Sequence, residues 1–205
     1  MFKNLKNQGA LGITLAAAGI LMITMGARQS IGLFVGPMNT STGLGIATIS
    51  FALAIAQFTW GAVQPIAGAA ADRWGPRAVL IGGVLMLAVG TAITPLMGTG
   101  PGLIFAQGLL VAAGAGAGSF SVLIGAAAQR MPAASRGSAS GVINAGGSLG
   151  QFVFAPIAQK LIQFVGWMGA MYTLAVMALL ALPLSGRVTN GGNTAHTAAA
   201  PGTGG

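Results

Sequence analysis

The chain has 205 residues, of which 54% are hydrophobic and only 5% are charged. Soluble domains carry about 25% charged residues, so this composition excludes a soluble globular protein and predicts one that lies in a lipid bilayer. The formal net charge is +8, but Lys and Arg occur singly or in pairs at the ends of apolar runs. That distribution indicates membrane topology signals, and no nucleic-acid partner is expected. The absence of Cys excludes disulfides and thiolate metal sites.

A polar N-terminus, residues 1–9, precedes the first apolar run, which extends over about 10–37. Residues 11–27 could form the core of a signal peptide, with small residues at its end as a cleavage site. The run nevertheless continues past Arg28, and no soluble domain follows. We therefore predict an uncleaved first membrane span.

Five further apolar runs are each about 20 residues or longer, the length that crosses a bilayer. The expected helices are 46–71, 78–97, 102–128, 137–159 and 165–184. Loop-forming residues mark the breaks between helices, at 39–43, 98–101, 131–135 and 164–167. We predict an all-α membrane protein with six transmembrane helices in residues 10–186. Residues 187–205, rich in Gly, Thr, Asn and Ala without periodicity, are expected to form a disordered cytoplasmic tail.

Basic residues predict the orientation of these helices. With six spans and a cytoplasmic N-terminus, only Lys160 falls on the outer side, and Arg28 lies within a span. Positive charge concentrates in cytoplasmic loops, so both termini are expected in the cytoplasm and the chain in a plasma membrane, with a bacterial inner membrane favoured. The basic residues on the cytoplasmic side would be Lys3, Lys6, Arg73, Arg77, Arg130, Arg136 and Arg187.

One charged stretch, residues 68–77, separates the second and third helices. It contains Asp72, the only acidic residue of the chain, with Arg73 and Arg77 beside it. We predict a tight loop at the membrane surface, in which a small residue at Gly68 lets the helices approach and Gly75 permits the turn. The simplest interpretation is that the charges only hold this loop at the surface.

The spacing G-x-x-x-D-R-x-G-x-R in this stretch resembles the loop signature of the major facilitator superfamily of secondary transporters. Three later motifs agree with that family's fifth and sixth helices: Arg136-Gly137, Asn144 to Gln151 followed by Ala155-Pro156, and Gly166-Trp167. The resemblance covers about residues 10–186 and implies the N-terminal half of a twelve-helix transporter, built as two inverted three-helix repeats. It also implies that the 68–77 residues serve gating, since the matching Asp contacts the other half of the protein.

A second six-helix half is therefore an expected partner, besides the lipid bilayer and a small-molecule substrate. Either the chain is a truncated product that lacks its C-terminal half, or it pairs with another chain; the tail looks unlike an evolved interface, which favours truncation. One departure from the family concerns Gln107. The family often has an Arg there, used in proton coupling, so the resemblance gives little support to a proton-driven drug antiporter.

Arg28 is the sharpest candidate for substrate binding, because a cation inside an apolar span is costly unless it faces a polar cavity or a partner. The alternative is that Arg28 reaches outward to the outer headgroups. The helix around Arg28 also looks like branches of the family that carry organic anions such as monocarboxylates. Other polar residues inside spans are further candidates for a cavity lining: Gln57, Gln64, Asn144 and Gln151.

Small residues recur at four-residue spacing in the fifth helix, at Gly137, Gly141 and Ala145 and again at Gly146 and Gly150. Such stripes predict tight helix crossings. The sequence lacks the residues that an intramembrane protease, a metalloenzyme or an ATPase would need. The one His, His196, lies in the tail, and there is no metal-binding cluster or phosphate-binding loop. No cofactor is expected.

The leading hypothesis is secondary active transport of a small organic anion by alternating access. A drug or sugar carrier of the same fold is one alternative. Another is a non-transporting membrane module that dimerises through its glycine faces.

Overall fold

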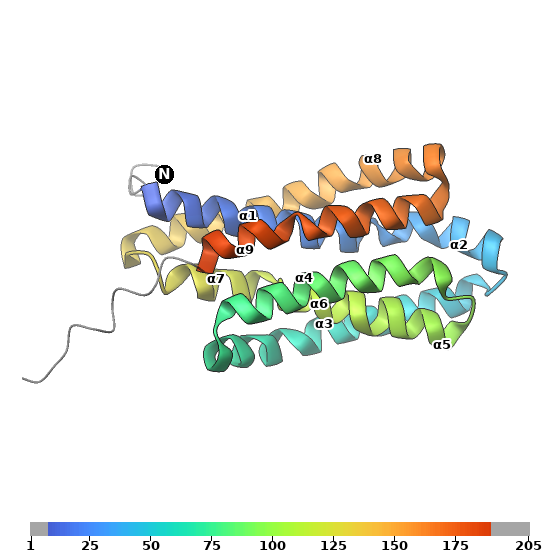
Figure 1. Cartoon of the computed structure of the whole chain (residues 1–205), viewed down its shortest axis with the longest axis horizontal. Helices are drawn as coiled ribbons and strands as arrows, with labels where there is room; N and C mark the ends of the chain where they lie inside the picture. Colours follow the sequence, from blue (N-terminus) through green and yellow to red (C-terminus); the bar gives the residue numbers. More distant parts are fainter. Residues whose placement is uncertain (1–7, 190–205) are drawn as a thin grey trace, which may run out of the picture.

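The computed structural model describes residues 8–189, and every regular secondary-structure element within that range is a helix (Figure 1). Five apolar segments are long enough to cross a membrane and run along the long axis of the molecule. They are Gly9–Thr42, Ile46–Trp74, Pro76–Leu96, Gly100–Ala128 and Ala133–Thr189. The all-α membrane fold is confirmed. The last segment has 57 residues, enough to cross twice, because about 20 residues span a bilayer.

The first segment consists of three helices without a break: α1 (Gln8–Gln29), the 3-10 helix η2 (Ser30–Phe34) and α2 (Val35–Thr42). It ends at Gly43, whose positive φ of 67° places it in the left-handed region. Its backbone N–H donates to the carbonyl of Asn39 at 3.0 Å, which is a C-terminal helix cap. The predicted loop at 39–43 was therefore placed too early, since helix continues to residue 42.

The second segment is α3 (Ile46–Trp74), and the third is α4 (Pro76–Ile93) followed by η3 (Thr94–Leu96). One residue, Gly75, joins α3 to α4, with φ of 85° and ψ of 145°. Only glycine adopts this conformation readily. The predicted loop at 68–77 is thus wrong in extent: α3 continues three residues past its predicted end at 71, and the charged residues lie on helices either side of a one-residue turn.

The fourth segment is irregular. It begins with α5 (Gly100–Leu103), continues as η4 (Ile104–Val111), which is a π-helix, and then as α6 (Ala112–Ala117) and α7 (Phe120–Ala128). Between α6 and α7 the helix is interrupted, and there Thr24 of α1 donates a hydrogen bond to the carbonyl of Gly118 at 3.3 Å. π-Helical turns and broken helices in membrane proteins occur where backbone lines a cavity or a functional site.

The fifth segment comprises α8 (Ala133–Leu179) and α9 (Ala181–Thr189). Gly166, with φ of 73° and ψ of 168°, divides α8 into two helical arms, and the chain reverses its direction between them (Figure 1). The predicted break at 164–167 is confirmed. Helix α9 extends through Thr189, beyond the predicted domain end at 186, and the rest of the predicted tail lies outside the described residues, as do residues 1–7.

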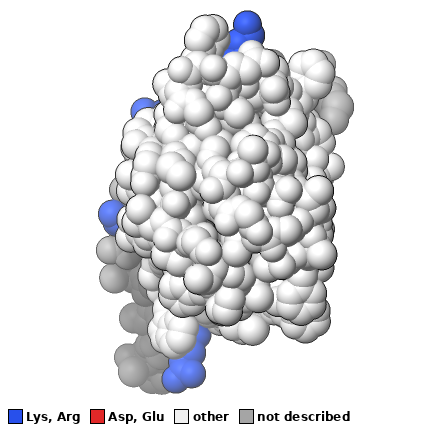
Figure 2. Space-filling view, turned by 90° about the vertical axis from the view of Figure 1, so that its right-hand side faces the viewer, with Lys and Arg blue, Asp and Glu red and all other residues white. Residues whose placement is uncertain are grey.

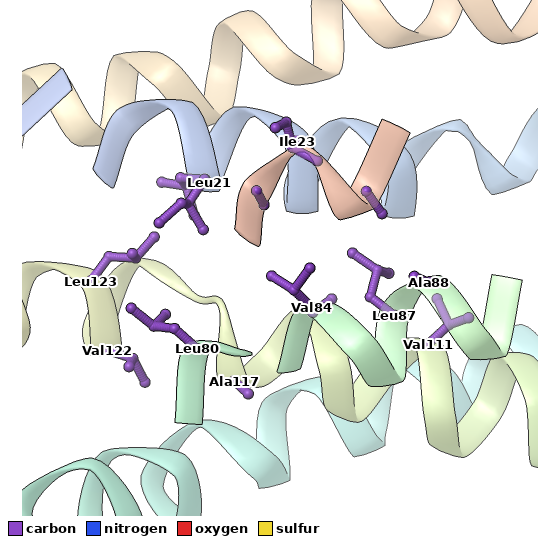
Figure 3. Packing of buried hydrophobic residues seen from close by; sticks show 14 of the residues in the cluster. Leu21, Ile23, Leu80, Val84, Leu87, Ala88, Val111, Ala117, Val122 and Leu123 are labelled. Carbon is purple, nitrogen blue, oxygen red and sulfur yellow. The ribbon is translucent and has the colours of Figure 1, made fainter. Parts of the chain in front are cut away.

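The helices form two groups. α1 lies along α8 and α9, and α4 packs against α3 and the fourth segment (Figure 1). Buried apolar side chains fill the space between the groups, including Leu21 of α1, Leu80 and Leu87 of α4 and Leu123 of α7 (Figure 3). In contrast, α3 buries only Ile49, Ala52 and Ala67, so most of its surface is free to face lipid or another helical unit.

The tightest crossing joins α1 and α8, and glycine makes it possible. A Cβ at Gly150 would collide with the backbone carbonyl of Met22, and one at Gly146 would lie 2.6 Å from the carbonyl oxygen of Ala18. The stripe containing Gly146 and Gly150 therefore packs as predicted. The other stripe does not, because a Cβ at Gly137 would meet nothing within 4 Å and that face of α8 is exposed.

Candidate functional site

The side chain of Arg28 is held inside the helical bundle. It is 8% exposed, and its Nη1 donates to Oε1 of Gln29 at 2.9 Å. The guanidinium carbon lies 4.3 Å from the ring centre of Trp60 on α3, a cation–π contact. Nη2 is buried and has no hydrogen-bond partner among residues 8–189. A buried donor without an acceptor is unfavourable, so this nitrogen marks a place where a ligand would gain binding energy.

Arg28 lines a cavity of about 250 Å³ between the first segment, α3 and η4. Three amides, of Gln29, Gln57 and Gln107, share this cavity with the guanidinium, and the remaining lining residues are apolar. No carboxylate lies among the lining residues. The cavity therefore has one fixed positive charge and neutral hydrogen-bonding groups around it, an environment that favours an anion.

A second cavity, of about 190 Å³, lies between α1, α3, α7 and α8. Its polar lining residues are Trp60, Gln64, Asn144, Ser148 and Gln151. Two contacts connect the cavities: Arg28 lies over the ring of Trp60, and Nε2 of Gln29 donates to Oε1 of Gln151 at 3.4 Å. The two cavities therefore share a wall.

The five residues predicted to bind substrate are distributed between these cavities. Arg28 and Gln57 line the first, and Gln64, Asn144 and Gln151 line the second. The structure thus brings together side chains from α1, α3 and α8. It places the Arg28 guanidinium inside the bundle. The alternative interpretation, in which Arg28 reaches the outer headgroups, would direct the side chain outward.

Sequence reasoning missed Trp60 and did not include Gln107 among the candidate lining residues. Trp60 stands three residues after Gln57 and four before Gln64, so all three share one face of α3, and this spacing was a usable signal. Gln107 is 2% exposed, and its Nε2 donates to Oγ1 of Thr94 at 2.8 Å. The π-helix that presents Gln107 to the cavity has no clear sequence signature.

The residues predicted to serve gating surround the turn at Gly75. Gly68, Asp72 and Pro76 line a cavity of about 180 Å³ with residues of α7, and Asp72 itself is exposed. Arg73 lies in the last turn of α3, 5.7 Å from the ring centre of Trp74, and Arg77 is the second residue of α4. The expectation for Gly68 was wrong. A Cβ there would meet nothing within 4 Å, because the close approach of α4 is to α6 at Gly83 and Gly114.

Within residues 8–189 there is no group of three or more His, Cys, Asp or Glu that could hold a metal ion. The polar groups that line the first two cavities are one guanidinium, an indole N–H, amides and a hydroxyl. Such groups bind a ligand through hydrogen bonds and charge.

Comparison with known proteins agrees with this geometry. The model of the Major Facilitator Superfamily matches residues 17–201. The chain belongs to the major facilitator superfamily, and is accordingly a membrane protein of a transporter family and no enzyme.

Two curated relatives are similar to this chain. The oxalate:formate antiporter of Oxalobacter formigenes is 30% identical over 169 residues, which is 82% of this chain and 40% of the antiporter. The probable sulfoacetate transporter SauU of Cupriavidus necator is 30% identical over 140 residues, 68% of this chain and 31% of that transporter. The chain thus spans less than half the length of the relatives that it matches.

Proposed function

We propose that this chain is the N-terminal half of a secondary transporter that moves a small organic anion by alternating access. The observation that carries this proposal is the buried guanidinium of Arg28, whose Nη2 has no partner among the described residues and which faces a cavity without a carboxylate. Within an apolar span, such a cation is stabilised by a negatively charged ligand.

Carboxylate and sulfonate anions suit this cavity. The names of the two relatives contain oxalate, formate and sulfoacetate, which are small anions with oxygen acceptors. The guanidinium can donate to such oxygens through charge-assisted hydrogen bonds, while Gln57 and Gln107 offer both donors and acceptors to the uncharged part of a substrate. We propose a small organic acid, such as a monocarboxylate, as the substrate class.

The second wall of the substrate site comes from another six-helix half. The chain covers only 40% and 31% of its relatives, and transporters of this architecture bind substrate between two halves that rock around it. α3 leaves Phe51, Phe58 and Ile66 exposed, at 61%, 78% and 65%. We propose that the second half covers part of this face and completes the cavities, whether it belongs to the same polypeptide or to another chain.

Uptake into reconstituted vesicles tests the proposal. Vesicles that contain the transporter and are loaded with unlabelled anion should take up labelled oxalate, formate or sulfoacetate faster than vesicles without protein. Lactose, a neutral solute, serves as the control for leakage and for a sugar carrier. Accumulation of lactose but not of the anions would favour a sugar carrier, and no protein-dependent flux of any solute would favour the non-transporting module.

Asp72 is proposed to stabilise one of the two conformations of the transport cycle. Asp72 shares a cavity with Pro76, the first residue of α4, so its charge lies near the positive end of that helix. A carboxylate at such an exposed place is worth about 0.3–1 kcal/mol. We expect Asp72→Asn to lower the maximal transport rate about two- to fivefold while it leaves the affinity for the anion within about twofold of wild type.

Initial uptake rates over a range of anion concentrations separate the two effects. Asp72→Glu, which keeps the charge, is the matched control and should recover most of the rate. A mutant with a normal maximal rate and much weaker binding would show that Asp72 belongs to the substrate site.

Both termini are proposed to lie in the cytoplasm. Arg73, Arg77, Arg130 and Arg136 lie around the turns at the end of the bundle opposite Gly166. The end that contains Gly166 shows Lys and Arg only at its rim (Figure 2). A fluorescent reporter fused after Gly205 should therefore be active, and an alkaline phosphatase fusion at the same place inactive. The reverse pattern would contradict this orientation.

A further inference from the structure

Two buried side-chain nitrogens lack a hydrogen-bond partner among residues 8–189: Nη2 of Arg28 and Nε1 of Trp60. Both belong to one contact, because the guanidinium carbon of Arg28 lies 4.3 Å from the centre of the Trp60 ring. An unsatisfied buried donor is unfavourable, and native proteins leave few of them. Because the two side chains are in direct contact, one acceptor group bound beside this contact would satisfy both donors.

The guanidinium is fixed in orientation before any ligand arrives. Nη1 of Arg28 donates to Gln29, and Gln29 in turn donates to Gln151 of α8. The ring of Trp60 covers the guanidinium, a contact that the planar group of Arg forms well. With rotation restricted in this way, less entropy is lost when Nη2 binds a ligand.

We infer that Trp60 is a second anion-binding residue, whose indole N–H and the Nη2 of Arg28 together hold two oxygens of one carboxylate or sulfonate group. Both groups are donors without acceptor capacity, so only acceptors fit between them. This inference rests on the proposed transport of organic anions and adds a selectivity: an anion with two oxygens engages both donors, whereas chloride offers a single centre.

The location of the two residues gives the anion a defined place. Arg28 lines the first cavity and Trp60 the second, so the charged group binds where the cavities share their wall. The rest of the substrate then extends toward Gln57 and Gln107 on one side, or toward Asn144 and Ser148 on the other. Trp60 is therefore a specificity-determining residue for the head group, and the amides contact the remainder.

Binding of labelled oxalate to the chain assembled with its second six-helix half, in the membrane in which it is made, tests the inference. Trp60→Phe keeps an aromatic ring beneath the guanidinium but removes the N–H. A hydrogen bond to a charged group lost in this way should weaken oxalate binding about tenfold or more. Trp74→Phe is the matched control, because Trp74 also lies beside an arginine, Arg73, but is 68% exposed; its affinity should equal that of wild type.

A measurement with Trp60 in place guards against a folding defect in Trp60→Phe. The chain contains three Trp, so the double variant Trp74→Phe/Trp167→Phe leaves Trp60 as the only indole. Its fluorescence should change with oxalate, saturating at the concentration that saturates oxalate binding, and chloride at equal concentration should have a much weaker effect.

Three outcomes are decisive. Tenfold weaker binding in Trp60→Phe together with the saturable fluorescence change supports the inference. Unchanged oxalate affinity in Trp60→Phe, with binding lost in Arg28→Gln, would overturn the role of Trp60 and leave the proposed function intact. Failure of the wild-type chain, assembled with its second six-helix half, to bind oxalate, formate and sulfoacetate would overturn both.

Discussion

Replacing Arg28 by Gln should weaken the binding of oxalate or a similar small anion about ten- to a hundredfold. A charge-assisted hydrogen bond is worth roughly 1.5–3 kcal/mol, and Arg28 supplies the only charge that lines the cavity. Binding of a neutral solute should change little. Titration of labelled oxalate against membranes that contain wild type or Arg28→Gln measures the difference.

Two control variants separate charge from geometry and from folding. Arg28→Lys keeps the positive charge but lacks the planar donor set and the stack on Trp60, so it should recover only part of the affinity. Arg136→Gln removes an arginine from the first turn of α8, away from both cavities, and should bind as wild type does. Membrane insertion of Arg28→Gln should not suffer, because a buried charge is removed. Equal affinities in wild type and Arg28→Gln would show that the guanidinium serves no ligand.

The second large effect is expected at the crossing of α1 and α8. A Cβ at Gly150 would collide with the backbone carbonyl of Met22, and the backbone of a helix cannot yield as a flexible side chain can. Overpacking of this kind costs about 1–3 kcal/mol or more. We expect Gly150→Ala to lower the midpoint of thermal unfolding by several degrees, roughly 5 °C or more, in detergent or lipid.

Gly137→Ala is the matched control in the same helix. A Cβ at Gly137 meets nothing within 4 Å, and Ala is favoured over Gly in a helix by about 1 kcal/mol. The unfolding midpoint should therefore stay the same or rise. If Gly150→Ala and Gly137→Ala unfolded at the same temperature, the contact between α1 and α8 would be looser than the structure shows.

The helical segments were predictable because the length of an apolar run is a strong signal in a membrane protein. The run lengths gave the ends of the apolar helical segments to within about six residues, and the predicted break at 164–167 contains Gly166, which divides the two arms of α8. The family signature around Asp72 led to the major facilitator superfamily before any fold was known. Each of these signals lies within one short stretch of the chain, so a single sequence is enough to recognise it.

The errors arose where the outcome depends on neighbouring helices. One glycine, Gly75, is enough to reverse the chain, so the predicted loop around it was too long. Of two similar small-residue stripes, only the one with Gly150 meets α1, and sequence spacing gives no information about which face finds a partner.

The candidate site was predicted only in part, because some of its residues are brought together by contacts between helices. Arg28 stood out as a charge within an apolar span. Trp60 did not, because its role depends on the contact with Arg28 across two helices. Gln107 lines the cavity from the π-helix η4, a backbone irregularity that no simple pattern predicts.

The most direct test of the account is the position of a bound anion relative to Arg28. Solid-state NMR can measure dipolar coupling between carbon-labelled oxalate and nitrogen-labelled arginine side chains of this chain, assembled with its second half in lipid. We predict a carbon–nitrogen separation of about 4 Å or less, as a hydrogen bond between carboxylate and guanidinium requires, and loss of this coupling in Arg28→Lys. Coupling that survives in Arg28→Lys, or bound oxalate without coupling to any guanidinium, would contradict the assignment of Arg28 as the anion site.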